Sequence, residues 1–171
     1  MRTLSIRELT HENFKIFGEF ISLEQSEHFP INAGTTKRFH ALSKIDATSQ
    51  NGEAIISLFR GQGFTLPFKP TIMERHPLGS QTFIPLTKNE LDKYLIIVAP
   101  SFCNSVKEII ENLVVFVAKG FEGVTYAKGV WHHPLVALNH ESDFIVIDRQ
   151  GVGHNCDEVE LNTNLVIGSI Q

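Results

Sequence analysis

Short β-favouring runs recur along most of this chain and limit its fold more than any other feature. Seven of them lie at residues 54–59, 81–86, 94–99, 113–118, 136–138, 143–148 and 165–168. Turn-forming pairs such as Asn51-Gly52 and Lys119-Gly120 stand between them. Many short strands with frequent turns favour an all-β sandwich or barrel over alternating strands and helices. We therefore expect a mainly β fold.

Two segments carry helix signals instead. Thr10 can cap a helix over residues 11–20, because apolar residues recur there at steps of three and four. Ser105, followed three residues later by Glu108, resembles a capping box and predicts a second short helix over residues 105–112. The expected fold is thus a β-barrel or sandwich with one or two short helices.

Composition bounds the class of protein. A chain of 171 residues, 42% hydrophobic and 20% charged, can bury a core without disulfides or structural metal, so we expect one domain over residues 1–171. A net charge of −4 without a Lys/Arg cluster argues against nucleic acid, and no apolar run approaches the roughly 20 residues that span a bilayer. Cys103 and Cys156 have no metal-type spacing, and the N-terminus lacks a signal peptide. These features predict a cytoplasmic protein with a small-molecule or protein partner.

The tripeptide His-Pro-Leu occurs twice, at residues 76–78 and 133–135, and the polar side chains beside it are candidates for chemistry. Glu74 and His76 project from the same face if their segment is extended. The Pro-Leu-Gly turn that follows should bring Gln81 back beside them. Such a set can hold a divalent ion or polarise a substrate. The alternative interpretation is a solvated Glu-Arg-His surface without function.

These spacings resemble the two signatures of the cupin family, small β-barrels with a site in the barrel mouth. The first signature has His-x-His and, after four residues, Glu; here Glu74, His76 and Gln81 occupy those places. The second has Gly-x-x-His, matched by Gly129 and His132. Gln in place of Glu removes a charge and weakens a site for a hard cation. The cupin resemblance implies an optional divalent ion, nickel or manganese ahead of zinc, and no other cofactor, with the ligands Glu74, His76, Gln81 and His132.

Four longer strings, at residues 31–40, 74–86, 123–135 and 143–158, resemble the ureidoglycolate lyase family of allantoin degradation, formerly called ureidoglycolate hydrolase. They follow in the same order over nearly the whole chain. The resemblance implies a cupin-like homodimer that splits ureidoglycolate into glyoxylate and urea, without nucleic-acid or membrane partners. Two alternatives remain: another cupin-type small-acid enzyme, and a non-catalytic cupin that binds a metabolite.

That reaction requires a base for the hydroxyl proton, an acid for the departing urea nitrogen and a cation for the carboxylate. We expect His76 and His132 as acid and base, with Glu74 as the alternative base. Arg60 is the first choice for the carboxylate, because a guanidinium binds it bidentately, and Lys128 is the second.

The remaining candidates surround these groups. Gln81 is expected to hydrogen-bond the ureido group or join the ion, and Trp131 to form a wall of the site unless it belongs to the core. Alternation along an extended strand turns Arg75 away, and of His132 and His133 at most one faces the site. The cupin spacing favours His132.

Three further expectations concern structure. Phe83 is expected in the core. Asp148 and Arg149, at the end of a strand, are expected to form a structural ion pair, with support of the site as the less favoured role. For His40 the alternatives of a site residue and a surface histidine stay open.

Overall fold

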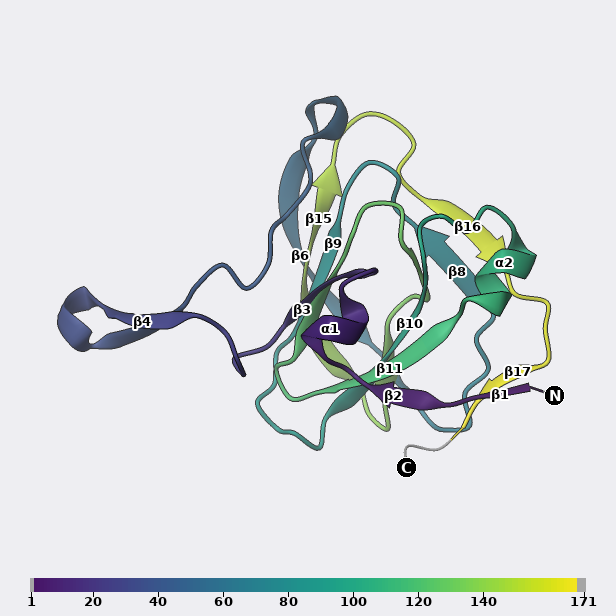
Figure 1. Ribbon diagram of the computed structural model, residues 1–171, viewed down its shortest axis with the longest axis horizontal. Coiled ribbons are helices and arrows are strands. Elements are labelled where there is room, and N and C mark those ends of the chain that lie inside the picture. The colour runs from purple at the N-terminus through teal and green to yellow at the C-terminus, as the bar shows by residue number, and fades with distance from the viewer. Residues whose placement is uncertain (1, 169–171) are drawn as a thin grey trace.

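Two β-sheets packed against each other dominate the computed structural model, which describes residues 2–168 (Figure 1). The five-stranded sheet has the order β3-β12-β9-β15-β6, with bounds Gly18–Ile21, Gly123–Tyr126, Gln81–Pro85, Ser142–Gln150 and Glu53–Gly61. The eight-stranded sheet has the path β16-β8-β13-β10-β11-β2, and β14 joins β10 to β7. Their bounds are Asp157–Glu160, Ile72–Arg75, Trp131–His132, Lys93–Ala99, Val114–Lys119, Ile6–Glu8, Val136–Leu138 and Gly63–Phe64. This sandwich is consistent with a cupin-like fold.

Two smaller sheets complete the set. β1 (Arg2–Leu4) pairs in parallel with β17 (Leu165–Ile167). β4 (His28–Ile31) and β5 (Thr36–Phe39) form a hairpin around the 3-10 turn η1 (Asn32–Gly34), and a second 3-10 turn, η2 (Ser49–Asn51), precedes β6. We call residues 28–39 the arm. Figure 1 shows it projecting far from the body, on the side where β3, β6 and β15 lie.

The mainly β expectation is confirmed. Each of the seven runs picked from sequence forms a strand: β6, β9, β10, β11, β14, β15 and β17. The second predicted helix is also confirmed as α2 (Val106–Glu111), whose N-cap Ser105 accepts a hydrogen bond from the backbone N–H of Glu108.

The first predicted helix is real but much shorter. Thr10 caps α1 (His11–Phe14) as expected, and its hydroxyl accepts from the N–H of Asn13. The helix does not reach residue 20, because Gly18 adopts φ +145° and starts β3 against β12. A Cβ at residue 18 would stand 1.8 Å from the carbonyl oxygen of Thr125, so only glycine allows this approach. Periodicity predicted the buried face of the segment but not the turn within it.

Two hydrophobic cores follow from the alternation of side chains along the strands. The first fills the space between the two sheets: Leu9, Phe14, Phe17, Phe20, Phe83, Tyr94, Ile96, Val98, Phe116, Ala118, Val124, Tyr126, Val130, Ala137, Phe144 and Val146. The second involves the opposite side chains of the eight-stranded sheet together with α2 and the strands of both chain ends, and includes Met73, Ile97, Ile109, Trp131 and Ile167. Within residues 2–168, no helix is both long and apolar enough to cross a membrane.

Candidate functional site

Glu74, His76, Gln81 and His132 meet beside the first core, and we call them the four-residue cluster. β13 places His132 opposite Glu74 on β8, while Gln81 begins β9 in the other sheet. The Nε2 atom of His132 lies 3.4 Å from Oε1 of Glu74 and 3.1 Å from Oε1 of Gln81. The Nε2 atom of His76 lies 4.0 Å from Oε1 of Glu74. The structure therefore brings together the side chains of both cupin-like signatures.

Backbone hydrogen bonds hold the two signatures in place. Gly129, at φ +78°, makes the turn before β13, and its N–H donates to the carbonyl of His76 over 2.9 Å. Asn155, just before β16, fixes the other side of the His-Pro-Leu turn. Its side-chain oxygen accepts from the N–H of Leu78 over 2.8 Å, and its carbonyl accepts from Nδ1 of His76 over 2.7 Å.

Both imidazoles have their Nδ1 proton committed to the main chain. His132 donates from Nδ1 to the carbonyl of Val130 over 3.0 Å, as His76 does to Asn155. A carbonyl oxygen only accepts, so in each neutral ring Nε2 carries a lone pair. The Nε2 atom of His76 is buried and has no hydrogen-bond partner among residues 2–168.

The cluster thus turns acceptor atoms toward one another. Two imidazole lone pairs, a carboxylate oxygen of Glu74 and the amide oxygen of Gln81 converge, and a weak contact of 3.5 Å from Gln81 Nε2 to Oδ2 of Asp148 favours this amide orientation. One oxygen or nitrogen each from Glu74, His76 and His132 lies within 4.8 Å of the others. Buried lone pairs without donors are unfavourable. The arrangement fits a cation, or a proton shared within the cluster.

Burial and charge decide the protonation of Glu74. Its side chain is 19% exposed, that of His76 15% and that of His132 only 1%, so solvent reaches the cluster past the first two. Burial favours a raised pKa for Glu74, but protonation of His132 turns its Nε2 into a hydrogen-bond donor to this carboxylate, and that bond together with the positive charge of protonated imidazoles outweighs burial and lowers the pKa. Glu74 is consequently a carboxylate at neutral pH.

Tyr126, at the end of β12, is a neighbour of the cluster that we did not predict. Its ring stacks on His132 with centroids 4.3 Å apart and planes 11° apart. Burial, and then the charge of Glu74, raise its pKa, so the phenol stays protonated. Its hydroxyl makes no hydrogen bond within residues 2–168. The sequence signal that could have found Tyr126 is the strand pattern of residues 123–126, shortly before the turn at Gly129.

Comparisons with known proteins agree with one another. The sequence pattern of the family described as Ureidoglycolate lyase matches residues 1–168. The chain belongs to the ureidoglycolate lyase family. A relative from Burkholderia mallei (strain NCTC 10229), named ureidoglycolate lyase, is 50% identical over 165 residues, covering 96% of this chain and 93% of that protein. One of the same name from Pseudomonas syringae pv. tomato is 44% identical over 171 residues, covering 98% and 96%.

In this member of the ureidoglycolate lyase family, Asp148 and Arg149 do not form the predicted ion pair. Successive residues of a strand point to opposite faces. Arg149 donates instead to the carbonyls of Ser49 and Val152, over 2.9 and 2.8 Å. Asp148 lies near Gln81, and its Oδ1 is buried without a hydrogen-bond partner in the described chain. Asp148 therefore supports the cluster, the role that sequence favoured less.

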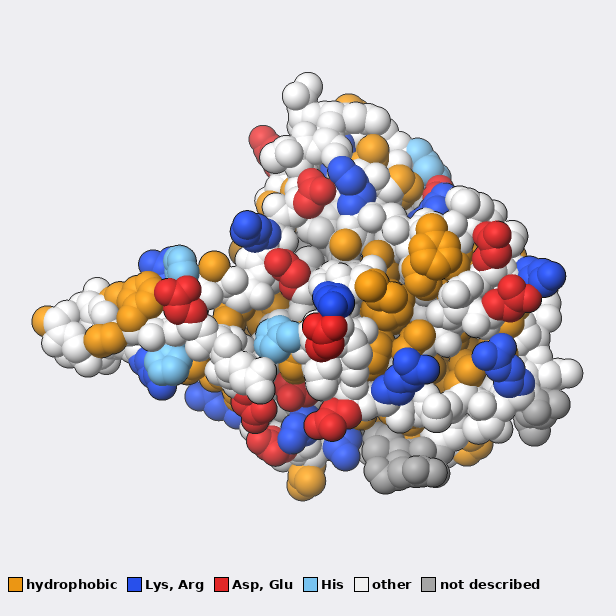
Figure 2. All heavy atoms as spheres, in the orientation of Figure 1, with side chains coloured by type: hydrophobic (Ala, Val, Ile, Leu, Met, Phe, Trp, Pro, Cys, Tyr) orange, Lys and Arg blue, Asp and Glu red, His pale blue; other side chains and the backbone are white. Residues whose placement is uncertain are grey.

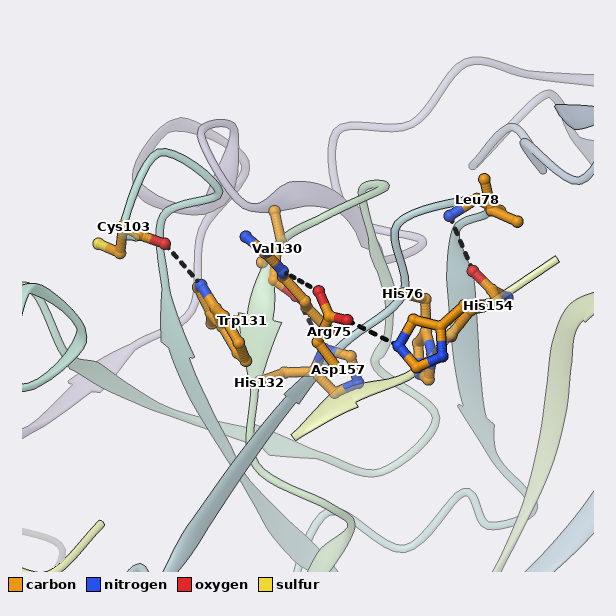
Figure 3. Close-up of polar contacts among 10 residues, drawn as sticks. Arg75, His76, Leu78, Cys103, Val130, Trp131, His132, His154 and Asp157 are labelled. Atoms are coloured by element: carbon orange, nitrogen blue, oxygen red, sulfur yellow. Dashed lines mark hydrogen bonds and ion pairs between the residues drawn. The ribbon is translucent and has the colours of Figure 1, made fainter. Parts of the chain in front are cut away.

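Trp131 is not a wall of the site, which corrects our first expectation for it. It precedes His132 on β13 and faces the second core, where its Nε1 donates to the carbonyl of Cys103 over 2.9 Å (Figure 3). The guanidinium of Arg75 lies 4.5 Å from the indole centroid and bonds Asp157 over 2.8 Å. Arg75 thus faces away from the cluster as predicted.

Replacing Trp131 by phenylalanine tests this structural role. We expect the free energy of unfolding to fall by about 2 kcal/mol, because the change leaves a small cavity and an unpaired Cys103 carbonyl. The value of kcat should stay within about 3-fold of wild type, a barrier change of only about 0.65 kcal/mol, because Trp131 faces the second core and not the cluster. Urea unfolding and steady-state kinetics measure the two effects. A large loss of kcat at unchanged stability would return Trp131 to the site.

Arg60 lies away from the cluster, so it does not fit the predicted role of carboxylate binder. Its side chain is 61% exposed and is already paired bidentately with Asp143, over 2.7 and 2.9 Å. Asp143 stands five residues before Asp148 on β15, about 17 Å along an extended strand. The sequence shows that Arg60 precedes a glycine at the end of a strand, but it does not show at which end of the sheet that residue lies.

Lys128 lies nearer, in the turn between β12 and β13. Its Nζ is 3.4 Å from Oδ2 of Asp46 and 3.2 Å from Oγ of Ser49. These contacts tie the segment before β6 to the turn that carries Gly129. Lys128 is therefore the better placed of the two predicted cations, although its charge is already shared with Asp46.

The other aromatic candidates lie outside the four-residue cluster. Phe83 is in the first core, as expected. His133 packs edge-on against Phe68 with centroids 5.3 Å apart, and burial lowers its pKa. His40 packs at a tilt against Phe29 at the root of the arm, with centroids 5.6 Å apart, and is outside the cluster.

Proposed function

We propose that this chain is a ureidoglycolate lyase that cleaves ureidoglycolate to glyoxylate and urea. The observation that carries the proposal is the convergence of Glu74, His76 and His132 at a solvent-accessible point, in a chain 44 to 50% identical to proteins named ureidoglycolate lyase over most of its length. Proton-transfer groups gathered this closely exceed what recognition of a small acid requires.

The reaction is a proton-assisted elimination at one carbon, which bears a hydroxyl, a ureido nitrogen and a carboxylate. As the hydroxyl proton leaves, its electron pair forms the carbonyl of glyoxylate, and the carbon–nitrogen pair departs on urea, which takes up a proton. Glu74 and His132 are 3.4 Å apart, so a proton taken by one can pass to the other. The unpartnered Nε2 of His76 is suited to exchange a proton with the leaving nitrogen.

As the alternative to direct proton transfer by these side chains, we propose that the four-residue cluster binds a divalent ion, with nickel or manganese preferred to zinc. Imidazole nitrogens suit nickel, and carboxylate and amide oxygens suit manganese. An ion held there would supply positive charge for the substrate carboxylate and would lower the pKa of the substrate hydroxyl. Asp148 and the backbone carbonyls of Val130 and Asn155 orient the ligands from outside the cluster.

The free hydroxyl of Tyr126 is proposed as a donor to the substrate. Tyr126→Phe should lower kcat/KM by about 10-fold, the worth of one hydrogen bond of about 1.4 kcal/mol, with stability unchanged. Tyr94→Phe is the matched control, because that buried hydroxyl donates to the carbonyl of Glu122 over 2.9 Å and not to a ligand. Equal kcat/KM for Tyr126→Phe and the wild-type protein would remove Tyr126 from substrate binding.

One assay decides among the candidate functions. Enantiopure ureidoglycolate is incubated with the protein while glyoxylate, urea and ammonia are measured together. Urea without ammonia supports the lyase, and ammonia in place of urea means a hydrolase that attacks the ureido carbonyl. Oxygen consumption would favour a cupin dioxygenase, whereas tight binding without turnover would favour a metabolite-binding module.

We also propose a homodimer in the cytoplasm. Cys103 is buried, Cys156 is exposed, and both are free, which suits a reducing compartment. The homodimer is supported by exposed apolar side chains on β6 of the five-stranded sheet, where Ile56 and Leu58 are 73% and 54% exposed. Native mass in solution tests the dimer, and fractionation of cells tests the compartment.

A further inference from the structure

A row of three polar side chains crosses the inner face of the five-stranded sheet, next to an apolar row of the first core. The apolar row runs across β12, β9 and β15 and consists of Val124, Phe83 and Val146. Two residues further toward the same end of the sheet, each strand presents its next side chain on the same face. These side chains are Tyr126, Gln81 and Asp148, and we call them the polar row.

Pairing and contacts confirm that the polar row is continuous. Tyr126 stands opposite Gln81. The antiparallel register of β15 with β9 brings Asp148 opposite Gln81 on the other side, where Oδ2 of Asp148 lies 3.5 Å from Nε2 of Gln81. His132, from the facing sheet, stacks on Tyr126 and lies 3.1 Å from Oε1 of Gln81. Only the Gln81 amide thus separates Asp148 from His132, so a group held by Asp148 lies beside the four-residue cluster.

One oxygen of Asp148 has no use in the fold. Its Oδ1 is buried without a hydrogen-bond partner, and Asp148 forms no ion pair within residues 2–168. The adjacent Arg149 points to the opposite face and donates to the carbonyls of Ser49 and Val152. A buried acceptor without a donor is unfavourable. Because the residue as a whole is only half-buried, a ligand can supply the missing donor.

The surface charge does not select a ligand in the same way. Figure 2 shows Lys and Arg side chains interspersed with Asp and Glu side chains on the face that it presents. Such a mixed surface draws no ligand by a field of one sign. Selection among small acids then depends on a few polar groups placed inside the site, as is usual for small-molecule pockets.

The ureido group is the donor-rich part of ureidoglycolate. It carries three N–H bonds, and one on each nitrogen can point in parallel away from the carbonyl oxygen. A carboxylate accepts such a pair as it accepts the fork of a guanidinium. The substrate carboxylate offers no donor and is repelled by a second carboxylate. Among the parts of the substrate, the ureido group therefore suits Asp148 best.

We propose that Asp148 recognises the ureido group of the substrate: Oδ1 accepts its N–H bonds while Oδ2 holds the Gln81 amide. This rests on the proposed function and deepens it, because it names the residue that distinguishes ureidoglycolate from acids of similar size without a ureido group. Proton transfer stays with Glu74, His76 and His132.

Two small acids that cannot undergo the elimination test the assignment. Ureidoacetate keeps the ureido group and the carboxylate but lacks the hydroxyl, and N-acetylglycine differs from it only by a methyl group in place of the terminal NH2. Titration calorimetry on the protein as purified should show at least about 10-fold tighter binding of ureidoacetate, because the methyl group removes one side of the N–H fork. Dissociation constants within about 3-fold of each other, or no binding of ureidoacetate, overturn the proposal without any substitution.

Substitutions separate recognition from support of the fold. Asp148→Asn should reduce the preference to less than about 3-fold, because an amide NH2 then faces the N–H bonds of the ligand, whereas Asp148→Glu keeps a carboxylate and should retain part of it. Asp143→Asn is the matched control, since that carboxylate on the same strand binds Arg60 and the preference should not change. If Asp148 only oriented Gln81, Asp148→Asn would weaken both acids alike and leave the preference intact, which overturns the assignment. Circular dichroism verifies that each variant is folded.

Urea release in the same samples reports on the lyase separately. A protein that prefers ureidoacetate but releases no urea from ureidoglycolate overturns the activity and leaves Asp148 as the ureido-binding residue. A protein that releases urea without this preference overturns the role of Asp148 and leaves the lyase standing.

Discussion

His132→Ala should lower kcat for urea release by about 100-fold or more, the usual loss when a group that transfers a proton is removed. The change deletes the only cluster side chain that contacts both Glu74 and Gln81, at 3.4 and 3.1 Å. It also leaves the buried ring of Tyr126 without its stacked neighbour. Steady-state kinetics with urea detection measures the effect, once the variant has been shown to be folded and its concentration has been determined.

The adjacent residue provides the matched control. His133→Ala removes the same side chain one position further along, where the ring packs on Phe68 and not on Glu74. Its kcat should stay within about 3-fold of wild type, a barrier change of only about 0.65 kcal/mol. If the two variants lost activity equally, the loss would be due to damage of the segment. If His132→Ala alone kept its activity, His132 would have no part in proton transfer.

Glu74→Gln should weaken binding of nickel or manganese by at least about 100-fold, more than the loss typical of groups outside the ligand shell. The substitution keeps the shape of the side chain and removes the only negative charge of the four-residue cluster. Titration calorimetry on protein stripped with a chelator and metal analysis of freshly purified protein both report binding without relying on turnover. Affinity should also fall as the pH is lowered, because protons compete for the same lone pairs.

A second acidic group makes this experiment selective. Glu74 also lies near Cys156 and Glu158, which are exposed. Glu158→Gln should leave the affinity unchanged if His76 and His132 provide the nitrogen ligands. Loss of the ion in Glu158→Gln would assign it to that second group, and full activity of metal-free wild-type protein would end the catalytic role of an ion.

The β-runs of the sequence predicted strands correctly, both where a run is buried along its whole length, as in residues 94–99, and where buried and half-buried side chains mix, as in residues 143–148. Sequence failed where a single contact overrides a pattern: helical periodicity continues to residue 20, yet Gly18 leaves the helix because β12 approaches its backbone. Very short strands such as β13 carry no pattern of their own. They form because longer neighbours, β8 and β10, offer hydrogen bonds to them.

The cluster itself was predictable because alternation and a proline turn are local rules. Predicting that cluster required only the two cupin-like signatures and the expectation that they meet in the fold. Its members are Glu74, His76, Gln81 and His132. Arg60 and Trp131 were misplaced because chemical suitability does not reveal which face or which end of a sheet a residue occupies. Tyr126 was missed for a different reason: a strand pattern over residues 123–126 does not reveal that its ring stacks on His132, which only the fold brings beside it.

The bonds from both Nδ1 atoms to backbone carbonyls have an evolutionary consequence. A side-chain partner can be lost by one mutation, whereas the carbonyls of Val130 and Asn155 are present whatever residues occupy those positions. Substitutions around the site can thus reshape the space open to substrate while the same nitrogen of each ring continues to face Glu74. Related chains are free to diversify in specificity without having to reinvent their reactive center.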